Sequence, residues 1–332
     1  MVSRDKIWYA VVNPNAGSGK TVSEWPVAAK ILSDSRIEFE YRTTWKMRAA
    51  VEITLKACSE GYRRFLAVGG DGTVHEVLEG IARYVEMSRV AHSLEDESEP
   101  LSLADFTLAV VPIGSGNDWI KALGIPKDFR KVAELMKKGS FGRQDVFALA
   151  MTDRYTGSRI ISYMANVGGV GFDANVCRRV NFEKNSGKKG KILYVKALVL
   201  NVLNFKSFDC VVEADGREVF RGTAMSIAMG VGKYSGGGMI QVPYAVMDDG
   251  MLDVTIIPLL PLRRIIPAVP GLFTGRLIES NPELVSVKCR RLSIRPLSAQ
   301  DTLVEVDGEV VGSLPVQVDI LEGQLNVLKD VQ

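Results

Sequence analysis

Three glycine-rich segments carry the residue types that bind phosphate. They read NPNAGSGKT (13–21), GGDGT (69–73) and PIGSGND (112–118). Each follows a short apolar run, and glycines between a strand and a helix N-terminus let backbone N–H groups approach an anion. Any one of them could be an ordinary turn, but together they predict a phosphate site in which Asp71 orders Mg²⁺.

The first segment ends like a Walker A loop, with Gly19, Lys20 and Thr21. That motif requires another glycine where this chain has Pro14. Proline fixes φ near −65° and has no N–H group, so it cannot help to wrap the backbone around a phosphate. We therefore expect a phosphate loop of another type, to which the Lys20 side chain could add positive charge.

Two carboxylates lie close together near the C-terminus, where VDGE places Asp307 and Glu309 two positions apart. On a regular strand both would lie on one face, and one could act as a general base. Asp-Gly is also a hairpin signal, so a solvated hairpin tip is the simpler alternative. With only two histidines, His75 and His92, the chain offers little for a Ser-His-Asp triad or a multi-histidine metal site.

The elements that must position these groups differ between the two halves of the chain. Strands and helices alternate in the first half, which predicts a parallel sheet covered on both faces, with ligands at the carboxyl ends of its strands. The expected strands are 8–14, 39–44, 64–70 and 106–114, and the expected helices are 46–60 and 73 to about 87, with a surface loop after residue 87.

Short alternating runs and glycine turns dominate the second half. Asp-Gly pairs at 215–216 and 307–308 predict two hairpins. We expect a β-sandwich with one helix at about 189–203. The predicted domains are 1–145, an α/β nucleotide-binding domain, and 146–321, with the tail 322–332 returning to the first.

Composition narrows the class of protein further. A length of 332 residues suggests two domains, and a net charge of +2 gives no case for nucleic-acid binding. The four cysteines form no C-x-x-C pair, which fits a reducing cytoplasm. No signal peptide is visible, and residues 254–273 carry four prolines and two arginines, so we expect a short amphipathic helix there rather than a membrane span.

A family resemblance rests on blocks from the whole chain. VVNPNAGSGK, VGGDGTVHEV and VPIGSGNDWIKALGIP together resemble the diacylglycerol kinase catalytic-domain family, which includes bacterial lipid kinases, sphingosine kinases and ceramide kinases. NVGGVGFDANV (166–176), GKYSGGGMIQVPYAVMDDGMLDV (232–254) and EVDGE (305–309) follow in family order. The resemblance implies a nucleotide-binding α/β domain, a β-sandwich domain, and a lipid kinase that transfers the γ-phosphoryl group of ATP to diacylglycerol, a sphingoid base or a related lipid in the cleft between them.

The resemblance also implies roles for individual residues. Glu309 would accept the proton, with Asp307 beside it and Asp71 near the phosphates and Mg²⁺. The Asp249 side chain and the backbone carbonyls of Val246 and Met251 would hold a structural Mg²⁺. The nucleotide residues, to which the residue argument adds Lys20, would be Asn13, Pro14, Asn15, Ala16, Gly17, Lys20, Thr44, Gly69, Gly70, Asp71, Gly72, Thr73, His75, Gly114, Ser115 and Asn117.

Two other functions are compatible with the same residues. GGDGT is shared with NAD kinases, but the GGGM and DGE blocks argue against an NAD kinase-like enzyme. A non-catalytic regulatory protein is the other alternative, and the intact Asp71, Asp307 and Glu309 argue against it.

The expected partners are a lipid substrate and a membrane surface. The segment 178–191 has six basic residues and one acidic residue, and 262–273 reads LRRIIPAVPGLF, so either could contact a membrane peripherally. We expect a cytoplasmic protein that does not bind nucleic acid, and a homodimer stays open.

Overall fold

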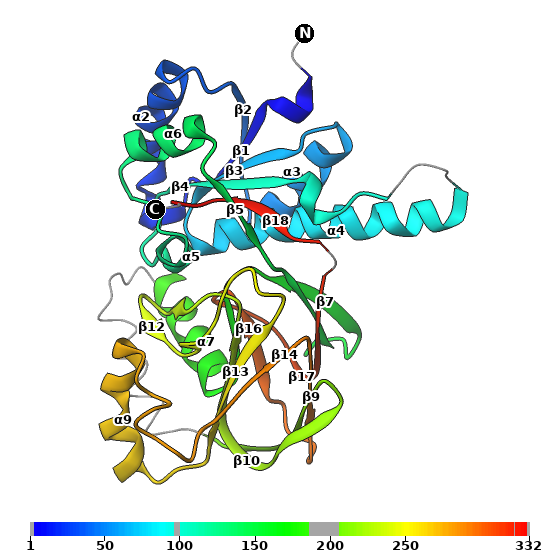
Figure 1. Cartoon of the computed structure of the whole chain (residues 1–332), viewed down its shortest axis with the longest axis vertical. Coiled ribbons are helices and arrows are strands. Elements are labelled where there is room, and N and C mark those ends of the chain that lie inside the picture. The colour runs from blue at the N-terminus through cyan, green and yellow to red at the C-terminus, as the bar shows by residue number, and fades with distance from the viewer. Residues whose placement is uncertain (1–2, 96–99, 186–205, 322, 331–332) are drawn as a thin grey trace. The chain divides into compact units, whose positions relative to one another are not determined.

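The computed structural model describes residues 3–95, 100–185, 206–321 and 323–330 (Figure 1). It divides into two units. The first contains residues 1–145 and 322–332, and the second contains residues 146–321. Each unit is built around its own sheet.

The first unit has a six-stranded sheet in the order β2-β1-β3-β4-β18-β5. Its neighbours are parallel except β18 and β5, which pair antiparallel. The apolar runs WYAVV and FLAV are buried throughout, as expected for central strands covered on both faces. The strands are β1 (Trp8–Val12), β2 (Phe39–Thr43), β3 (Arg64–Gly69), β4 (Thr107–Pro112), β5 (Phe141–Gln144) and β18 (Leu325–Leu328).

Helices connect the parallel strands. They are η1 (Arg4–Lys6), α1 (Ala16–Gly19), α2 (Thr21–Asp34), α3 (Ala49–Ser59), α4 (Asp71–Glu95), η2 (Leu103–Asp105), α5 (Asp118–Ala122) and α6 (Phe129–Lys138). The prediction of a loop after residue 87 is wrong for residues 88–95, which continue α4, so His92 is helical. The segment is polar, but it holds no glycine or proline before Pro100, so nothing in it ends the helix.

Strand β18 comes from the far end of the chain. It lies between β4 and β5, where Asn326 and Val327 pair with Thr107 and Leu108 (Figure 1). The Ser140 hydroxyl donates to the Lys329 carbonyl over 2.6 Å. The C-terminal segment is thus an interior strand of the first unit.

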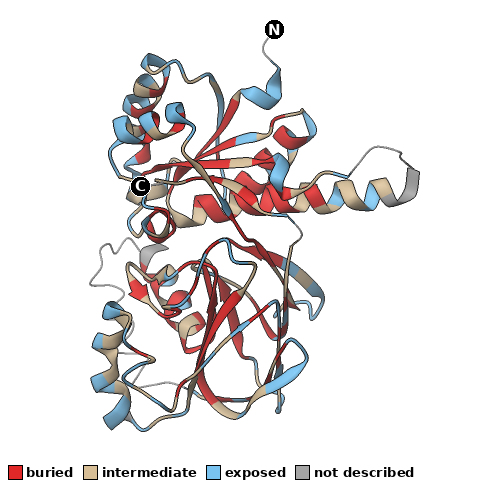
Figure 2. Ribbon diagram, viewed as in Figure 1, coloured by how far each residue is buried: buried red, intermediate tan, exposed pale blue. Residues whose placement is uncertain are grey.

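The strands of the second unit form a closed sheet. Strands β10, β8, β16, β17, β15 and β9 pair in that order, and β9 pairs again with β10. Figure 2 shows many buried residues along these strands, and buried apolar residues form one core cluster. Its strands are β6 (Phe147–Thr152), β7 (Arg159–Met164), β8 (Val167–Gly171), β9 (Phe208–Ala214), β10 (Arg217–Gly230), β11 (Tyr234–Ser235), β12 (Met239–Ile240), β13 (Leu252–Pro258), β14 (Val285–Cys289), β15 (Arg291–Pro296), β16 (Leu303–Val306) and β17 (Glu309–Ile320).

Both predicted Asp-Gly hairpins are confirmed. Residues 215–216 join β9 to β10, and residues 307–308 join β16 to β17. Both residues of each pair have positive φ, as a two-residue type I′ turn requires.

Two helices of the second unit matter for function. Helix α7 (Phe172–Asn185) is not among the sequence predictions, because its first turn follows a glycine-rich run. Helix α9 (Leu262–Thr274) confirms the predicted amphipathic helix. The predicted helix at 189–203 lies outside the described residues. Within the described part of the chain, no helix is long and apolar enough to cross a membrane.

Candidate active site

The three glycine-rich segments meet at one edge of the first sheet, at the carboxyl ends of its parallel strands. The backbone N–H groups of Asn13 and Ile113 donate to the carbonyls of Val68 and Gly69, over 3.0 Å and 2.9 Å. Residue Thr44 follows β2 at the same edge and is buried. The edge therefore gathers the predicted nucleotide residues of the first unit.

The glycines of this edge are required for packing between loops. A Cβ atom on Gly114 would lie 2.1 Å from Asn117 Oδ1 and 2.5 Å from the Gly70 Cα atom. One on Gly69 would lie 2.2 Å from Thr73 Oγ1, and one on Gly17 would lie 2.6 Å from the Ile113 carbonyl oxygen. A larger residue at any of these positions would push the loops apart.

The NPNAGSGKT loop differs from a Walker A loop, as Pro14 predicts. The residues from Gly17 to Gly19 have left-handed φ angles, which lead the chain into α2. The Thr21 hydroxyl donates to the Ala16 carbonyl over 3.2 Å, so it stabilises the loop itself. Asn13 donates from Nδ2 to Thr73 Oγ1 over 3.2 Å, which links this loop to GGDGT.

Asp71 is the first residue of α4 and links the second segment to the third. Its Oδ1 atom accepts a hydrogen bond of 3.0 Å from the backbone N–H of Trp119. Asn117 adopts a left-handed conformation at the N-cap of α5 and donates from Nδ2 to the Gly114 carbonyl over 2.9 Å. Ser115 and Lys20 are exposed beside these loops.

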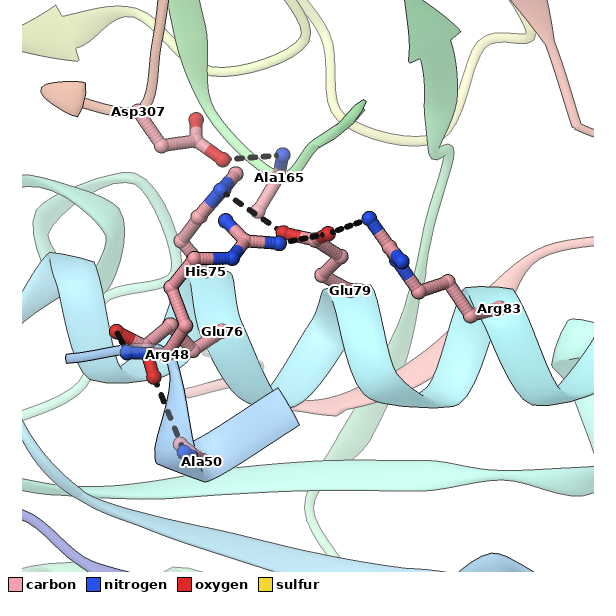
Figure 3. Close-up of polar contacts among 8 residues, drawn as sticks. All are labelled: Arg48, Ala50, His75, Glu76, Glu79, Arg83, Ala165 and Asp307. Carbon is pink, nitrogen blue, oxygen red and sulfur yellow. Dashed lines mark hydrogen bonds and ion pairs between the residues drawn. The ribbon is translucent and has the colours of Figure 1, made fainter. Parts of the chain in front are cut away.

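His75 belongs to a buried charge cluster on α4 that the sequence does not reveal. Its Nε2 atom lies 3.6 Å from Glu79 Oε2, and Glu79 also pairs with Arg48 and Arg83 (Figure 3). Glu79 is 1% exposed, whereas the two arginine side chains are about half exposed. This cluster holds the turn that follows Thr44 against α4.

Glu76 fixes the same turn through its backbone. Its two carboxylate oxygens accept the N–H groups of Arg48 and Ala50, over 3.2 Å and 3.1 Å. Figure 3 shows these bonds beside the Glu79 cluster. Only the pairs of Glu79 with His75 and Arg83 have a spacing visible in the sequence, four positions on one helix. The bonds of both glutamates to the turn span about 26 to 31 positions and leave no local pattern.

In the second unit, Asp307 is engaged by backbone groups. Its Oδ2 and Oδ1 atoms accept the N–H groups of Ala165 and Asn166, both over 2.8 Å, and Figure 3 shows the first of these bonds. Its own N–H group donates to the Val167 carbonyl over 2.9 Å. Asp307 therefore ties the hairpin tip to the connection between β7 and β8.

Glu309 is exposed at the start of β17, two residues after Asp307. The Asn181 side chain on α7 donates to Glu309 Oε2 over 3.3 Å and to the Gly308 carbonyl over 3.0 Å. The Cys177 thiol donates to the same carbonyl over 2.8 Å. Helix α7 thus supports the turn that presents Glu309.

A third carboxyl group lies beneath this turn. Glu305 is buried, and its Oε2 atom accepts the Gly308 N–H over 2.9 Å. Burial raises the pKa of Glu305 well above its usual value, and the charges of Asp173, Asp307 and Glu309 add to the effect, while the Gly308 bond opposes it. The buried Glu305 carboxyl group therefore keeps its proton to a higher pH than an exposed glutamic acid does.

Asp249, which is predicted to hold a structural Mg²⁺, pairs with a lysine. Asp249 Oδ1 accepts the Met251 N–H over 3.0 Å, and Lys288 Nζ lies 2.8 Å from Asp249 Oδ2 and 3.3 Å from Asp253 Oδ2. The Mg²⁺ site at Val246, Asp249 and Met251 stays a prediction.

The second unit also contains an apolar pocket beneath α9. Helix α9, the start of α7, β10, β12 and the end of β13 line it. The space within it, its open mouth included, is about 620 Å³. Its polar lining residues are Asp173, Ser226, Gln241 and Asn281.

Comparison with known proteins identifies the family. The model described as "Diacylglycerol kinase catalytic domain" matches residues 8–149, and the model described as "YegS C-terminal NAD kinase beta sandwich-like domain" matches residues 166–329. The chain belongs to the diacylglycerol kinase catalytic-domain family. The sequence-based prediction of family, fold class and kinase-type enzyme is confirmed.

Relatives of the family match nearly the whole chain. A protein named "Probable lipid kinase YegS-like" from Xanthomonas campestris is 25% identical over 96% of this chain and 95% of its own length. A protein named "Diacylglycerol kinase" from Staphylococcus aureus is 26% identical, with 96% and 90% covered. A crystal structure titled as a diacylglycerol kinase from Bacillus anthracis has the same fold, with a TM-score of 0.68, 20% identity, and 98% and 97% of the two chains covered.

Proposed function

We propose that this chain is a lipid kinase that transfers the γ-phosphoryl group of ATP to a hydroxyl group of a lipid. The observation that carries the proposal is the convergence of three glycine-rich loops at the N-terminal end of α4. Backbone N–H groups and the positive end of a long helix favour phosphate there. The names of the relatives supply the class of acceptor.

In this proposal the first unit binds ATP. The contacts come from 13–17, Lys20, Thr44, 69–73 and 114–117, and the exposed Lys20 places its charge among the phosphates. His75 supports the site from within, because it is buried against Glu79. A Mg²⁺ ion bound with the nucleotide would neutralise phosphate charge, and Asp71 is the carboxylate placed to orient its shell.

The second unit supplies the base. Glu309 is exposed and hydrogen-bonded by one neutral amide, so it can accept the proton of the lipid hydroxyl as that oxygen attacks phosphorus. Asp307 is held by two backbone N–H groups. We therefore assign Asp307 to positioning and Glu309 to proton transfer.

A membrane surface is the proposed source of the lipid. Helix α9 exposes Ile266 and Phe273 beside Arg263, a combination that suits the headgroup region of a bilayer. Changing Ile266 and Phe273 to Ser should weaken vesicle binding and leave activity on detergent-dispersed lipid unchanged. Equal loss in both settings would contradict this role. The basic segment 178–191 extends beyond the described residues.

The proposal is tested by phosphoryl transfer. The purified chain is incubated with γ-labelled ATP, Mg²⁺ and a mixed lipid extract, with NAD in a parallel tube. The control is Asp71→Asn, because asparagine keeps an acceptor for the Trp119 amide. We expect label in the organic phase with the wild type only. Label in NADP alone would show an NAD kinase-like enzyme, and transfer to neither would support the regulatory alternative.

Nucleotide binding by the first unit is tested separately. Gly114→Ala forces apart two loops and should abolish ATP binding, because its Cβ would lie 2.5 Å from the Gly70 Cα atom. Gly139→Ala is the matched control, since Gly139 lies close to the start of β5, as Gly114 lies close to the end of β4, but has open space around it. It strains a left-handed position, at a cost of about 1 kcal/mol, and should bind ATP normally. Normal binding by Gly114→Ala would exclude these loops as the nucleotide site.

A further inference from the structure

The turn that follows β2, residues 44–50, carries an exposed tryptophan beside the proposed phosphate loops. Trp45 is 66% exposed, whereas Trp8, Trp25 and Trp119 are each at most 8% exposed. Tryptophan offers one of the largest apolar surfaces of any side chain. Single exposed apolar residues are common, so the place and the rigidity of this turn decide whether Trp45 has a function.

The turn lies at the edge of the sheet where the glycine-rich segments meet. Strand β2 pairs with β1, which pairs with β3, so the turn lies one strand from NPNAGSGKT and two strands from GGDGT. Neighbouring strands lie about 4.8 Å apart, so about 10 Å separates the end of β2 from the end of β3, a span that an extended nucleotide can bridge. The Thr44 N–H donates to the Val12 carbonyl over 2.8 Å, which ties the turn to the start of the first loop.

Two glutamates of α4 hold the turn in one conformation. Glu76 accepts the N–H groups of Arg48 and Ala50, and the buried Glu79 pairs with the Arg48 guanidinium (Figure 3). Arg48 has a left-handed φ of 64°, which is strained for a residue with a Cβ atom. Such strain persists only where surrounding contacts impose it, and it is concentrated at functional sites. Because the turn is fixed beforehand, a ligand of Trp45 would lose little binding energy in ordering it.

The turn offers an aromatic surface rather than a further phosphate site. Both of its cations are paired within the first unit, Lys46 with Glu52 over 2.7 Å and Arg48 with Glu79. An exposed indole ring binds flat aromatic groups by stacking, and every nucleobase has such a face. The ligand that suits both the turn and the neighbouring loops is therefore a nucleotide, with its phosphates at the glycines and its base at Trp45.

We propose that Trp45 binds the base of the nucleotide by stacking, and that the turn 44–50 is the base-binding part of the site. This assignment rests on the proposed binding of ATP by the first unit. A purine has two fused rings and covers more of an indole than a pyrimidine does. ATP and GTP should therefore bind more tightly than CTP and UTP, and the preference should depend on Trp45.

The test measures the binding of ATP, CTP and inorganic tripolyphosphate to the whole chain by calorimetry, with Mg²⁺ present. Trp45→Ala should weaken ATP binding by about 5- to 150-fold, the loss that follows when one stacked aromatic side chain is replaced by alanine. CTP binding should weaken less, and tripolyphosphate binding should not change. Met47→Ala is the matched control, because Met47 is 82% exposed in the same turn, and it should bind ATP as the wild type does.

Fluorescence supplies a second measurement on the unmodified chain. Because the other three tryptophans are buried, quenching by acrylamide reports mainly on Trp45, and ATP should protect it while tripolyphosphate should not. Protection by phosphatidylglycerol vesicles but not by ATP would overturn the assignment in favour of a membrane contact.

Two results of the calorimetry would also overturn it: unchanged ATP binding in Trp45→Ala, or an equal loss of ATP and tripolyphosphate binding. ATP binding that Gly114→Ala abolishes and Trp45→Ala leaves unchanged would refute the role of Trp45 alone. A wild type that binds no ATP would refute the proposed function as well.

Discussion

Two hairpin tips of the second unit share one construction. Asp215-Gly216 and Asp307-Gly308 both have positive φ at each residue. Each aspartate donates its N–H to a carbonyl of a neighbouring segment over 2.9 Å. Asp215 Oδ1 accepts the N–H groups of Arg290 and Arg291 over 3.0 Å and 2.9 Å, as Asp307 accepts those of Ala165 and Asn166.

The neighbours of the two tips differ. Before and after Asp215 stand Glu213, which pairs with Arg295 at the surface, and the exposed Arg217. The corresponding residues around Asp307 are Glu305, which is buried, and Glu309, which is exposed and bonded by Asn181.

The comparison distinguishes the residues that hold the turn from those that are proposed to act in the reaction. Because an aspartate that also accepts two backbone N–H groups occurs at a tip with no proposed activity, the turn accounts for the bonds between Asp307 and the backbone. What is particular to the 307–308 tip is the set of groups that α7 and β16 place around it. Four variants test this difference, from the largest expected effect to the smallest.

Glu309→Gln should have the largest effect. Loss of the base should lower the rate of phosphoryl transfer by about 10²- to 10⁴-fold. Stability should change by less than about 0.5 kcal/mol, because the side chain is exposed. Arg217→Gln, at the matching position of the other tip, should leave transfer unchanged. A Glu309→Gln enzyme with wild-type kcat would remove the distinction between the two tips.

Asp307→Asn should destabilise the fold, because its two N–H donors bind different carboxylate oxygens and an amide offers only one acceptor oxygen. Asp215→Asn should destabilise it less, because both of its donors bind Oδ1, an acceptor that the amide keeps, and only the charge is lost. Urea unfolding should show a loss of about 1.5–3 kcal/mol for the partly buried Asp307 and about 0.5–1.5 kcal/mol for the exposed Asp215. Only Asp307→Asn should slow transfer, by up to about 10²-fold, because Glu309 is then misplaced. If transfer fell as much as in Glu309→Gln while stability held, Asp307 would be a second catalytic group.

Glu305→Gln should change how stability depends on pH. Because the folded protein raises the pKa of Glu305 above its ordinary value of about 4.5, the folded state binds a proton more tightly than the unfolded state. The contribution of Glu305 to stability is therefore complete below about pH 4.5 and is lost as pH rises toward the folded-state pKa.

Unfolding measured over this range should show the stability of the Gln variant increasing relative to that of the wild type as pH rises, because glutamine has no proton to lose. Glu213→Gln controls for the substitution at the other tip. A difference that does not vary with pH would mean that Glu305 is not perturbed by burial.

Asn181→Ala should have the smallest effect. It removes one neutral hydrogen bond to Glu309 and one to the Gly308 carbonyl. Each is worth about 1 kcal/mol, so kcat should fall by no more than about tenfold. An unchanged kcat would show that α7 does not position the base.

Much of the first unit can be predicted from the sequence. Strand, glycine turn and helix follow one another, so GGDGT and PIGSGND had to reach the same edge of a parallel sheet. What could not be predicted is why the glycines are needed. Gly70 and Gly114 touch each other, and contacts between loops 44 residues apart leave no local pattern.

In the second unit, the sequence predicts the turns but not the contacts that hold them. The hairpins at 215–216 and 307–308 follow from Asp-Gly alone. The partners of their aspartates do not, because Ala165 and Arg290 contribute only backbone groups, which have no sequence signature. The sequence does not indicate a role for Asp173, because the residue comes directly after the glycine-rich run NVGGVG and Phe172. In the structure it lies in the first turn of α7 and lines a pocket.

The place of β18 has a consequence for how the protein is made. On the ribosome, residues 1–145 emerge long before residues 325–328, which complete the middle of their sheet. Until residues 325–328 have been synthesised, β4 and β5 lack the strand that pairs with both. The sheet of the first unit therefore stays incomplete, with unpaired strand edges, while the whole of the second unit is synthesised and can fold.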